Sequence, residues 1–326
     1  MTVLVAINTR DAIVLAADSQ GTITRPFVDP ADLSEFFDPD NDRRLRTSSD
    51  GQPLLDTWSR IASHTIEMPY KVHSEVEKLF ALDPLKMGVM ASGIASIGDR
   101  TIKSLIADFK TTAAFSELSL NDYTLGKTAS SLLEFLWPEY EKIYTSGQRP
   151  DLELMICGYD TNRYTPGVIR VYIHERRVAE PDYDFCIFFG GITREIQRLL
   201  FGIDSDTKLR LMERNRQLLA TYHSYLSQQL KEQGVDIELP KPEDFGSELS
   251  LFNGLELNSL RMNCATYSEQ DAVECADFLV NVMIKSQRFS DQIPTTGGKV
   301  QTALIKKHSG FRFISPRHPY MDDSSN

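Results

Sequence analysis

Thr2, the residue that follows the initiator methionine, carries two groups that could act together in one reaction. Once Met1 is removed, its hydroxyl is a nucleophile and its α-amine is a base on the same residue. Methionine is normally trimmed when the next residue is as small as threonine, so we expect the mature chain to begin at Thr2. An α-amine has a reference pKa of about 8, so a useful fraction is unprotonated at neutral pH. Thr2 therefore points to hydrolysis of an amide, if other residues support it.

Lys78, Asp18 and a glycine turn could supply that support. A lysine beside Thr2 would lower the pKa of the amine by like-charge repulsion and would stabilise negative charge on the hydroxyl oxygen. Such a lysine needs a carboxylate partner, and Asp18 closes the second apolar run of the chain. Backbone N–H groups at a glycine turn before a helix suit an oxyanion, and Ser92-Gly93-Ile94 is such a turn.

The elements that must hold these residues are predicted from the apolar pattern. Apolar runs at 2–7 and 12–17 predict a β-hairpin that ends at Asp18. Two packed sheets with helices outside would account for the order strands, two helices, strands, two helices, strands. The other predicted strands are 78–82, 87–92, 152–157, 168–174, 185–189, 300–305 and 311–314, and the predicted helices are 94–109, 122–144, 192–201, 208–231 and one capped by Ser268.

Short motifs in these elements resemble one known family. They are Thr2-Val3-Leu4-Val5, Ala16-Ala17-Asp18-Ser19, Lys78-Leu79-Phe80, Met90-Ala91-Ser92-Gly93 and Ile94-Ala95-Ser96-Ile97-Gly98-Asp99. An N-terminal threonine, an Ala-x-Asp element, a lysine before an apolar pair and a Ser-Gly turn resemble the proteasome β-subunit branch of the N-terminal nucleophile hydrolases. That branch includes the HslV peptidase and the bacterial Anbu proteins.

The resemblance implies a fold and a set of site residues. The implied fold is α+β, a four-layer αββα sandwich. The implied site residues are the catalytic Thr2, Asp18, Lys78 and Gly93, the last as donor of the oxyanion N–H, and the substrate-binding Phe80, Ala91 and Ala95. The implied mechanism requires no metal or cofactor.

Two later segments match the family pattern only in part. Phe189-Gly190-Gly191 resembles its Gly-Ser-Gly turn, but Gly190 stands where a serine hydroxyl is expected near the threonine amine. Asp291 with Thr296-Gly297 resembles its late Asp-x-x-Ser-Gly element and makes Asp291 a further catalytic candidate. The spacing between them is longer than in the family, and Pro294 intervenes. The proton-relay part of the predicted site therefore departs from the family.

The chain is predicted to be one proteasome-type domain over 1–326, with insertions at about 21–67 and 204–262 and a flexible tail at 316–326. The first insertion is rich in proline and polar residues, which predicts a long loop. Because the matching loop borders the substrate cleft in the family, we expect this insertion to cap or narrow the cleft, or to make ring contacts. In the second insertion, the charged helix 208–231 is most simply solvated, and the alternative is a ring-contact or docking element.

Composition excludes several classes of protein. A hydrophobic fraction of 41% and a charged fraction of 25% are typical of a soluble globular chain. The net charge of −11 argues against nucleic acid, and no segment has the roughly 18 apolar residues of a membrane helix. The four cysteines are scattered without a CxxC, which indicates reduced, mostly buried thiols and no zinc site. With no signal-peptide pattern at the N-terminus, we expect a cytoplasmic protein.

The resemblance implies a threonine-type endopeptidase that assembles with its own copies into a ring. Its substrates would be peptides or unfolded proteins, and an ATPase activator is a further partner to test. Two alternatives remain open at this point. One is an amidase of the same superfamily that acts on a small amide, and the other is a non-catalytic assembly subunit.

Overall fold

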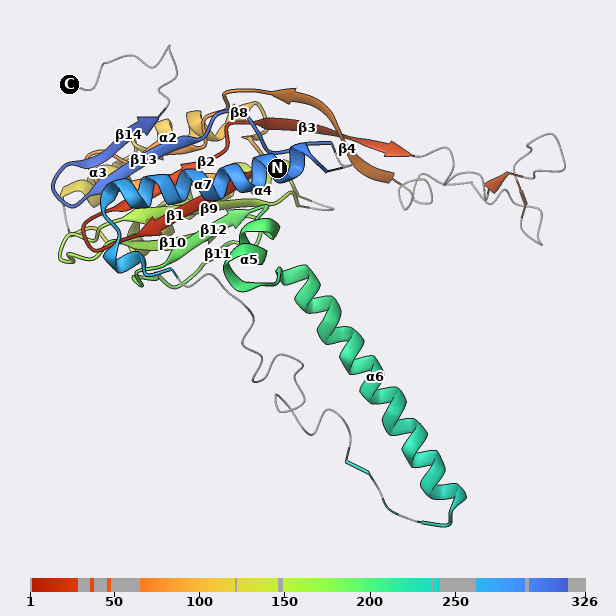
Figure 1. The fold of residues 1–326 in the computed structure, drawn as a ribbon. Helices are drawn as coiled ribbons and strands as arrows, with labels where there is room; N and C mark the ends of the chain where they lie inside the picture. The colour runs from red at the N-terminus through yellow and green to blue at the C-terminus, as the bar shows by residue number, and fades with distance from the viewer. Residues whose placement is uncertain are drawn as a thin grey trace.

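Two five-stranded antiparallel sheets, accompanied by helices, give the chain a mixed α/β fold. The structure is a computed structural model, and it describes residues 2–28, 36–37, 46–47, 65–120, 122–145, 149–235, 237, 239–240, 262–290 and 293–315. Figure 1 shows the sheets beneath α7 (Glu269–Arg288), with two segments that extend away from them.

The first sheet contains the N-terminal strand. It consists of β1 (Val3–Asn8), β2 (Ile13–Ala17), β12 (Ile187–Gly191), β13 (Gln301–Lys306) and β14 (Gly310–Ser315). The strand order is β12-β1-β2-β13-β14, so β1 is paired on both sides. The predicted N-terminal hairpin is confirmed, with Leu4 opposite Ala17. On the other edge of β1, Val3 lies opposite Gly191.

The second sheet faces the first. It consists of β5 (Leu79–Ala81), β6 (Met87–Gly93), β9 (Leu152–Gly158), β10 (Gly167–Tyr172) and β11 (Arg177–Val178). The strand order is β11-β10-β9-β6-β5, which places the glycine turn after β6 beside the start of β9. The predicted strand pair around Asp83-Pro84 is confirmed as β5 and β6.

Alternate side chains of β1 pack into two different cores. Val3, Val5 and Ile7 join a cluster with residues of the helices, whereas Leu4 and Ala6 join a cluster with residues of the second sheet. This follows from the two-residue repeat of a strand. Because both faces are covered, the sequence of β1 is a continuous apolar run, and each Leu-sized side chain stabilises the fold by about 1.5–3 kcal/mol.

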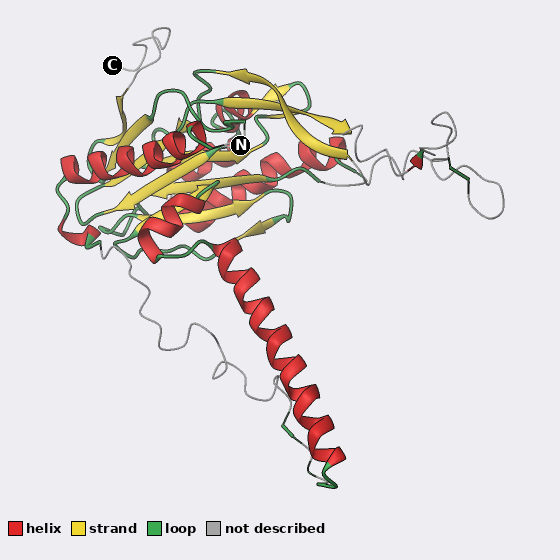
Figure 2. Cartoon of the chain, turned by 45° about the vertical axis from the view of Figure 1, so that its right-hand side comes forward, coloured by secondary structure: helices red, strands yellow, loops and turns green. Residues whose placement is uncertain are grey.

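Helices cover the outer face of each sheet (Figure 2). α5 (Arg194–Phe201) and α7 pack on the first sheet, and Ser268 caps α7 in a capping box with Asp271. α2 (Ile102–Phe109), α3 (Ala113–Leu120) and α4 (Leu125–Ile143) pack on the second sheet. Short helical turn η3 (Cys264–Thr266) precedes α7.

The helix predicted over 94–109 is wrong in its first half. Residues there form the small hairpin β7 (Ser96–Ile97) and β8 (Arg100–Thr101), and the helix begins only at Ile102. Two local features explain the late start. Gly98 has a positive φ of 57° at the hairpin turn, and the Thr101 hydroxyl caps the helix by accepting from the Ser104 N–H.

The loop predicted over 21–67 is also partly wrong. β3 (Gly21–Val28) and β4 (Thr65–His73) pair as an antiparallel ribbon that extends from the sheets. β3 contains Pro26, which a two-stranded ribbon tolerates because each strand has one free edge, where a missing N–H costs no ladder bond. Along the ribbon, the Arg25 guanidinium lies 3.7 Å from the centre of the Tyr70 ring.

α6 (Ser205–Glu232) confirms the helix predicted in the second insertion. It runs for 28 residues away from the sheets, and none of its residues is buried (Figure 1). Its first turn is fixed by Asp204, which accepts from the Thr207 N–H at 2.9 Å and from Arg198 Nε at 2.7 Å. No helix within the described residues is both long enough and apolar enough to cross a membrane. The predicted tail at 316–326 lies outside the described residues.

Candidate active site

Thr2 lies directly before β1 and is only 6% exposed. Its carbonyl accepts a hydrogen bond from the Ile192 N–H at 2.8 Å, and the next N–H, that of Val3, donates to Asp18 Oδ1 at 2.9 Å. These hydrogen bonds extend the antiparallel pairing of β1 back to Thr2. Strand alternation then places the Thr2 side chain on the same side as Leu4, toward the second sheet.

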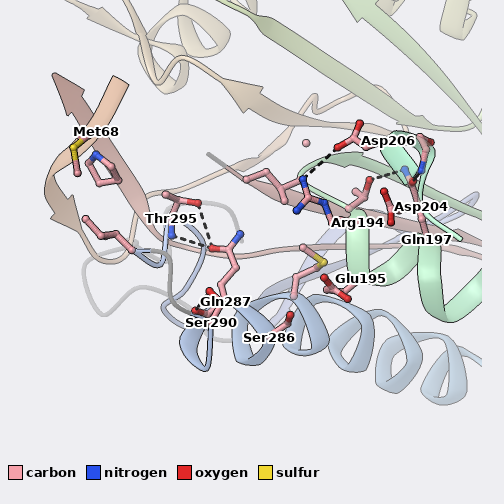
Figure 3. Close-up of a pocket in the computed structure, with 17 residues that line it drawn as sticks. Met68, Arg194, Glu195, Gln197, Asp204, Asp206, Ser286, Gln287, Ser290 and Thr295 are labelled. Atoms are coloured by element: carbon pink, nitrogen blue, oxygen red, sulfur yellow. Dashed lines mark hydrogen bonds and ion pairs between the residues drawn. The ribbon is translucent and has the colours of Figure 1, made fainter. Parts of the chain in front are cut away.

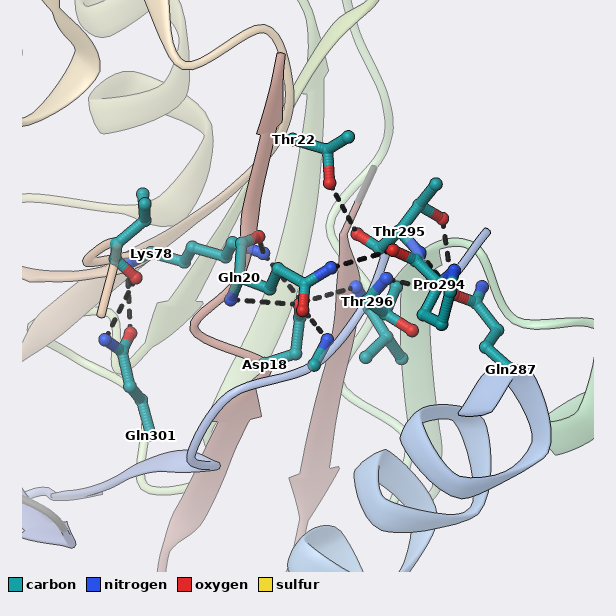
Figure 4. A network of polar contacts seen from close by, with 12 residues as sticks. Asp18, Gln20, Thr22, Lys78, Gln287, Pro294, Thr295, Thr296 and Gln301 are labelled. Atoms are coloured by element: carbon teal, nitrogen blue, oxygen red, sulfur yellow. Dashed lines mark hydrogen bonds and ion pairs between the residues drawn. The ribbon is translucent and has the colours of Figure 1, made fainter. Parts of the chain in front are cut away.

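Asp18 is fully buried beside the N-terminus and accepts from four donors (Figure 4). Its Oδ1 receives Lys78 Nζ at 2.7 Å and the Val3 N–H at 2.9 Å. Its Oδ2 receives the Gly297 N–H at 3.1 Å and the Gln20 N–H at 3.3 Å. Only an acceptor-only carboxylate satisfies four donors in this way. Asp18 therefore links the end of β2, the start of β1 and the loop that contains Gly297 through one carboxylate.

Lys78 directs its ammonium into this buried site. Its Nζ donates to Asp18 Oδ1 and to the Gln20 carbonyl, each at 2.7 Å. Burial lowers the pKa of Lys78, and the Asp18 carboxylate opposes that shift. Among the described residues Nζ donates to these two acceptors, which leaves one of its three N–H donors without a partner in that part of the chain.

Two glutamines that the sequence analysis missed hold Lys78 in place. Gln301 accepts from the Lys78 backbone N–H and donates to the Val76 carbonyl, both at 3.0 Å. Gln20 supplies the second acceptor for Lys78 and donates from its side chain to the Pro294 carbonyl at 2.9 Å. A glutamine has no periodic or motif signal, so nothing in the sequence distinguishes these two from the others.

Gly93 ends β6 at the glycine turn and has a positive φ of 101°. A Cβ added there would lie 2.0 Å from the Asp151 carbonyl oxygen, closer than any side chain can tolerate. The next N–H, that of Ile94, is already used by the same carbonyl at 3.0 Å. The turn is therefore fixed tightly against the start of β9, and only glycine fits it.

Replacing Gly93 by alanine is expected to lower the free energy of unfolding by at least about 2 kcal/mol, because both the backbone conformation and the Asp151 contact are violated. Urea unfolding measures this loss. Gly126→Ala, in α4, is the matched control. The atom nearest to an added Cβ there is the Thr124 hydroxyl oxygen, 4.0 Å away, so no loss of stability is expected. Equal stability of the two variants would contradict the assigned turn.

The loop after α7 reaches the site from the other side. Gln287 Oε1 accepts from the backbone N–H groups of Thr295 and Thr296, both at 2.9 Å, and so presents the Gly297 N–H to Asp18. The Thr296 hydroxyl is buried without a hydrogen-bond partner within the described residues. Asp291, the remaining catalytic candidate, lies outside the described residues.

The glycine pair at the end of β12 lines Thr2 on its other flank. A Cβ on Gly191 would lie 2.1 Å from the Thr2 carbonyl oxygen, so this position must be glycine. Gly190, opposite Leu4, has ordinary space around it. The departure from the family pattern at Gly190 is therefore not forced by crowding.

The residues predicted to bind substrate occupy different environments. Phe80 is 5% exposed and Ala91 is 9% exposed, and both belong to the core between the second sheet and its helices. Ala95 is exposed in the turn before β7. The described residues bring together Thr2, Asp18 and Lys78, whereas Phe80 and Ala91 face the helix side of the second sheet.

A cleft of about 1100 Å³ lies on the side of the first sheet covered by α5 and α7 (Figure 3). Thr2 does not line it, but Gly191, Ile192 and Thr295 do, and Ile192 is hydrogen-bonded to Thr2. The walls come from β4, α5, the start of α6 and the end of α7. An ion pair between Arg194 of α5 and Asp206 of α6, 3.2 Å apart, joins two of these walls.

The four cysteines are poor nucleophiles in this fold. Burial raises the pKa of Cys275 to about 11 and that of Cys186 to about 12, and it raises the pKa values of Cys157 and Cys264 as well. No cluster of three or more His, Cys, Asp or Glu side chains with metal-binding geometry occurs among the described residues. Thr2 is therefore a better candidate nucleophile than any of the four cysteines.

Iodoacetamide at pH 8 is expected to leave all four cysteines unmodified in the folded protein. At a pKa of about 11, roughly one Cys275 side chain in a thousand is a thiolate at that pH. Intact mass before and after treatment measures the number of adducts. In denaturant the same reagent should add four groups, and rapid single modification of the folded chain would contradict the pKa assignment.

Similarity to known proteins is found among solved structures. No protein-family model matches the sequence, and no curated protein matches it. The chain is similar to Anbu (ancestral beta-subunit) from Yersinia bercovieri, with 11% identity, a TM-score of 0.46, and coverage of 98% of this chain and 89% of that chain. It is also similar to the Anbu (Gly-1) mutant from Hyphomicrobium sp. strain MC1, with 9% identity, a TM-score of 0.45, and coverage of 98% and 90%.

Proposed function

We propose that this chain is a threonine-type peptidase of the proteasome β-subunit type, in which Thr2 becomes the nucleophile after Met1 is removed. The proposed architecture is the four-layer αββα sandwich of the N-terminal nucleophile hydrolases. Its support is the packing of α5 and α7 on one sheet and of α2, α3 and α4 on the other, with a third core between the sheets.

One observation supports the proposal most directly. Asp18 Oδ1 accepts from Lys78 Nζ at 2.7 Å and from the N–H of Val3 at 2.9 Å. The Lys78 ammonium and the N–H of the peptide bond that joins Thr2 to Val3 therefore share one acceptor, Asp18 Oδ1. Burying a charged pair is costly unless its hydrogen bonds are complete, and the bonds of Lys78 and Asp18 meet this condition at the start of β1, where the proposed nucleophile lies.

The proposed reaction proceeds in four steps. The free amine of Thr2, through a water molecule, takes the proton from the Thr2 hydroxyl. The oxygen attacks the substrate carbonyl, and the ammonium of Lys78 lowers the cost of the negative charge that develops. The Gly93 N–H stabilises the oxyanion, and the protonated amine returns its proton to the leaving amine. Water then hydrolyses the acyl ester and restores Thr2.

The proposed substrates are peptides or unfolded proteins. The proposed partners are further copies of this chain in a ring, and an ATPase activator. α6 is a candidate contact for either, because all its residues are at least partly exposed. A cytoplasmic location is proposed with this function.

Two measurements on the purified protein test the proposal. Intact mass reports whether Met1 is absent, and a peptidyl epoxyketone reports whether Thr2 is reactive, since this probe needs both the hydroxyl and the free amine of an N-terminal threonine. The expected result is loss of Met1 and a single adduct on Thr2. Retention of Met1, or no adduct on a chain that begins at Thr2, would overturn the peptidase assignment and favour a non-catalytic assembly subunit.

The same protein also separates a peptidase from a small-amide hydrolase. A panel that runs from acetylated dipeptide amides to unfolded casein is expected to show cleavage within long chains. Turnover confined to the smallest amides would favour the amidase alternative.

A further inference from the structure

We infer that Glu153, held by Arg170, is a positioning residue for the amine of Thr2. This inference rests on the proposed function, because it assigns a role within the same site. It concerns the flank of Thr2 opposite Lys78, where Gly190 offers no side chain.

The two residues form an ion pair across neighbouring strands. Glu153 lies on β9 and Arg170 on β10, and Arg170 Nη1 donates to Glu153 Oε1 at 3.0 Å. The other guanidinium nitrogen, Nη2, crosses to the first sheet and donates to the Phe189 carbonyl at 2.8 Å. Arg170 thus fixes the carboxylate and also ties the second sheet to the strand that ends in the glycine pair.

This arrangement leaves the second carboxylate oxygen directed at the glycine pair. A Cβ built on Gly190 would lie 3.7 Å from Glu153 Oε2. Among the described residues no hydrogen bond to Oε2 is found, so the oxygen is free to accept from water or from a cation. The Glu153 side chain is 17% exposed, which gives water access to it.

Thr2 lies at the same end of the space between the sheets. Ser92 is the register partner of Glu153, and a Cβ built on Gly191 would lie 3.6 Å from the Ser92 Cβ and 2.1 Å from the Thr2 carbonyl oxygen. The glycine pair therefore separates Thr2 from Ser92 and Glu153 by backbone alone. The absence of two side chains opens the path between the carboxylate and the N-terminus.

The charges around the N-terminus are then arranged in two pairs. Lys78 with Asp18 lies on the β2 side, and Glu153 with Arg170 lies on the β12 side. The Lys78 ammonium disfavours the protonated amine, and the Glu153 carboxylate favours it. A carboxylate that accepts from the amine, directly or through water, keeps the nitrogen oriented toward the hydroxyl while it exchanges its proton.

The labelling rate with the peptidyl epoxyketone, measured from pH 6 to 10, tests this role. Glu153→Gln keeps the shape of the side chain and removes its charge, so the pKa of the amine should fall. We expect the rising limb of the rate profile to move to lower pH by roughly half a unit or more. Glu134→Gln is the matched control, since Glu134 is also paired with an arginine but lies exposed on α4.

A rescue variant separates positioning from structural support. Glu153→Ala should lower the labelling rate about 10-fold or more at its plateau. Adding Gly190→Ser to it places a hydroxyl near the position of the lost carboxylate, because an added Cβ lies 3.7 Å from Glu153 Oε2 and no closer than 3.4 Å to any neighbour, and it should recover at least about a third of the lost rate. A thermal melt of each variant shows whether it is folded, and Glu153→Gln decides the question if the alanine variant is not.

The outcomes distinguish this inference from the proposed function. Thr2-dependent labelling with an unchanged pH profile in Glu153→Gln would overturn the positioning role and leave the peptidase assignment intact. A wild-type protein that begins at Thr2 and takes no label would overturn both. A shifted profile together with rescue by Gly190→Ser supports the role, because a purely structural residue would change neither.

Discussion

Replacing Thr2 by alanine is expected to lower kcat/KM for peptide hydrolysis by at least about 10³-fold and to abolish epoxyketone labelling. Alanine removes the hydroxyl but keeps a residue small enough for methionine removal, so the free amine and the fold remain. The buried site should survive, since the bonds that fix the Thr2 backbone involve its carbonyl and the next N–H. The change in the free energy of unfolding should stay within about 1 kcal/mol.

Two controls assign the loss to the nucleophile. Thr2→Ser keeps the hydroxyl and should retain measurable hydrolysis. An N-terminal tag that is not removed keeps the hydroxyl but blocks the amine, and it should be as inactive as Thr2→Ala. Hydrolysis that persists in Thr2→Ala would mean that another residue attacks the substrate, and the high pKa of Cys275 makes a thiol an unsuitable substitute.

The strands around the site are predictable from sequence because their environment is uniform. β1 and β2 are covered on both faces, so nearly every position must be apolar, and the run stands out without any periodicity. Asp18 breaks that run, and its polar side chain must find donors. The donors it finds are largely backbone N–H groups whose position follows from the hairpin itself.

The contact between Lys78 and Asp18, unlike these strands, cannot be predicted from a local sequence pattern. The two residues are 60 positions apart, and no local pattern predicts that they meet. The contact was expected because a lysine beside Thr2 needs a carboxylate partner, and the resemblance of Lys78-Leu79-Phe80 to a known motif supported it. The roles of Gln301 and Gln287 were missed for the same reason. The side-chain amide of each forms hydrogen bonds with a segment that is brought near only by the fold.

The elements that were predicted wrongly owe their form to local exceptions. In the ribbon of β3 and β4, proline lies where one strand edge is unpaired, so its usual effect on a strand is absent. Before α2, the apolar residues Ile94 and Ile97 have helical spacing, but a positive φ at Gly98 produces a hairpin instead. Propensity summed over a window does not register a single glycine with that conformation.

The buried pair of Lys78 and Asp18 gives the second large effect. Asp18→Asn should abolish labelling of Thr2 and lower the free energy of unfolding by about 3–5 kcal/mol. The amide can accept at one oxygen only, and its NH₂ group would face N–H donors that now bond to the second carboxylate oxygen. Urea unfolding gives the stability and epoxyketone labelling gives the reactivity of each variant.

Lys78→Met should abolish labelling at a smaller cost in stability than Asp18→Asn. Methionine has nearly the same length, and the remaining Asp18 carboxylate keeps its three backbone donors. The desolvation of the ammonium, which lowers the pKa of Lys78, is no longer required. Arg176→Met is the control, because the Arg176–Glu134 pair is exposed and its loss should change stability by less than about 1 kcal/mol.

The double variant separates the structural role of the pair from its chemical role. Asp18→Asn with Lys78→Met contains no unpaired buried charge, so its loss of stability should be smaller than the sum of the single losses by about 1–3 kcal/mol. Its Thr2 should still be unreactive, because no cation is left beside the hydroxyl. Additive stability losses would mean that the two side chains do not depend on each other in the fold. Labelling at the wild-type rate in a folded double variant would mean that Thr2 reacts without them.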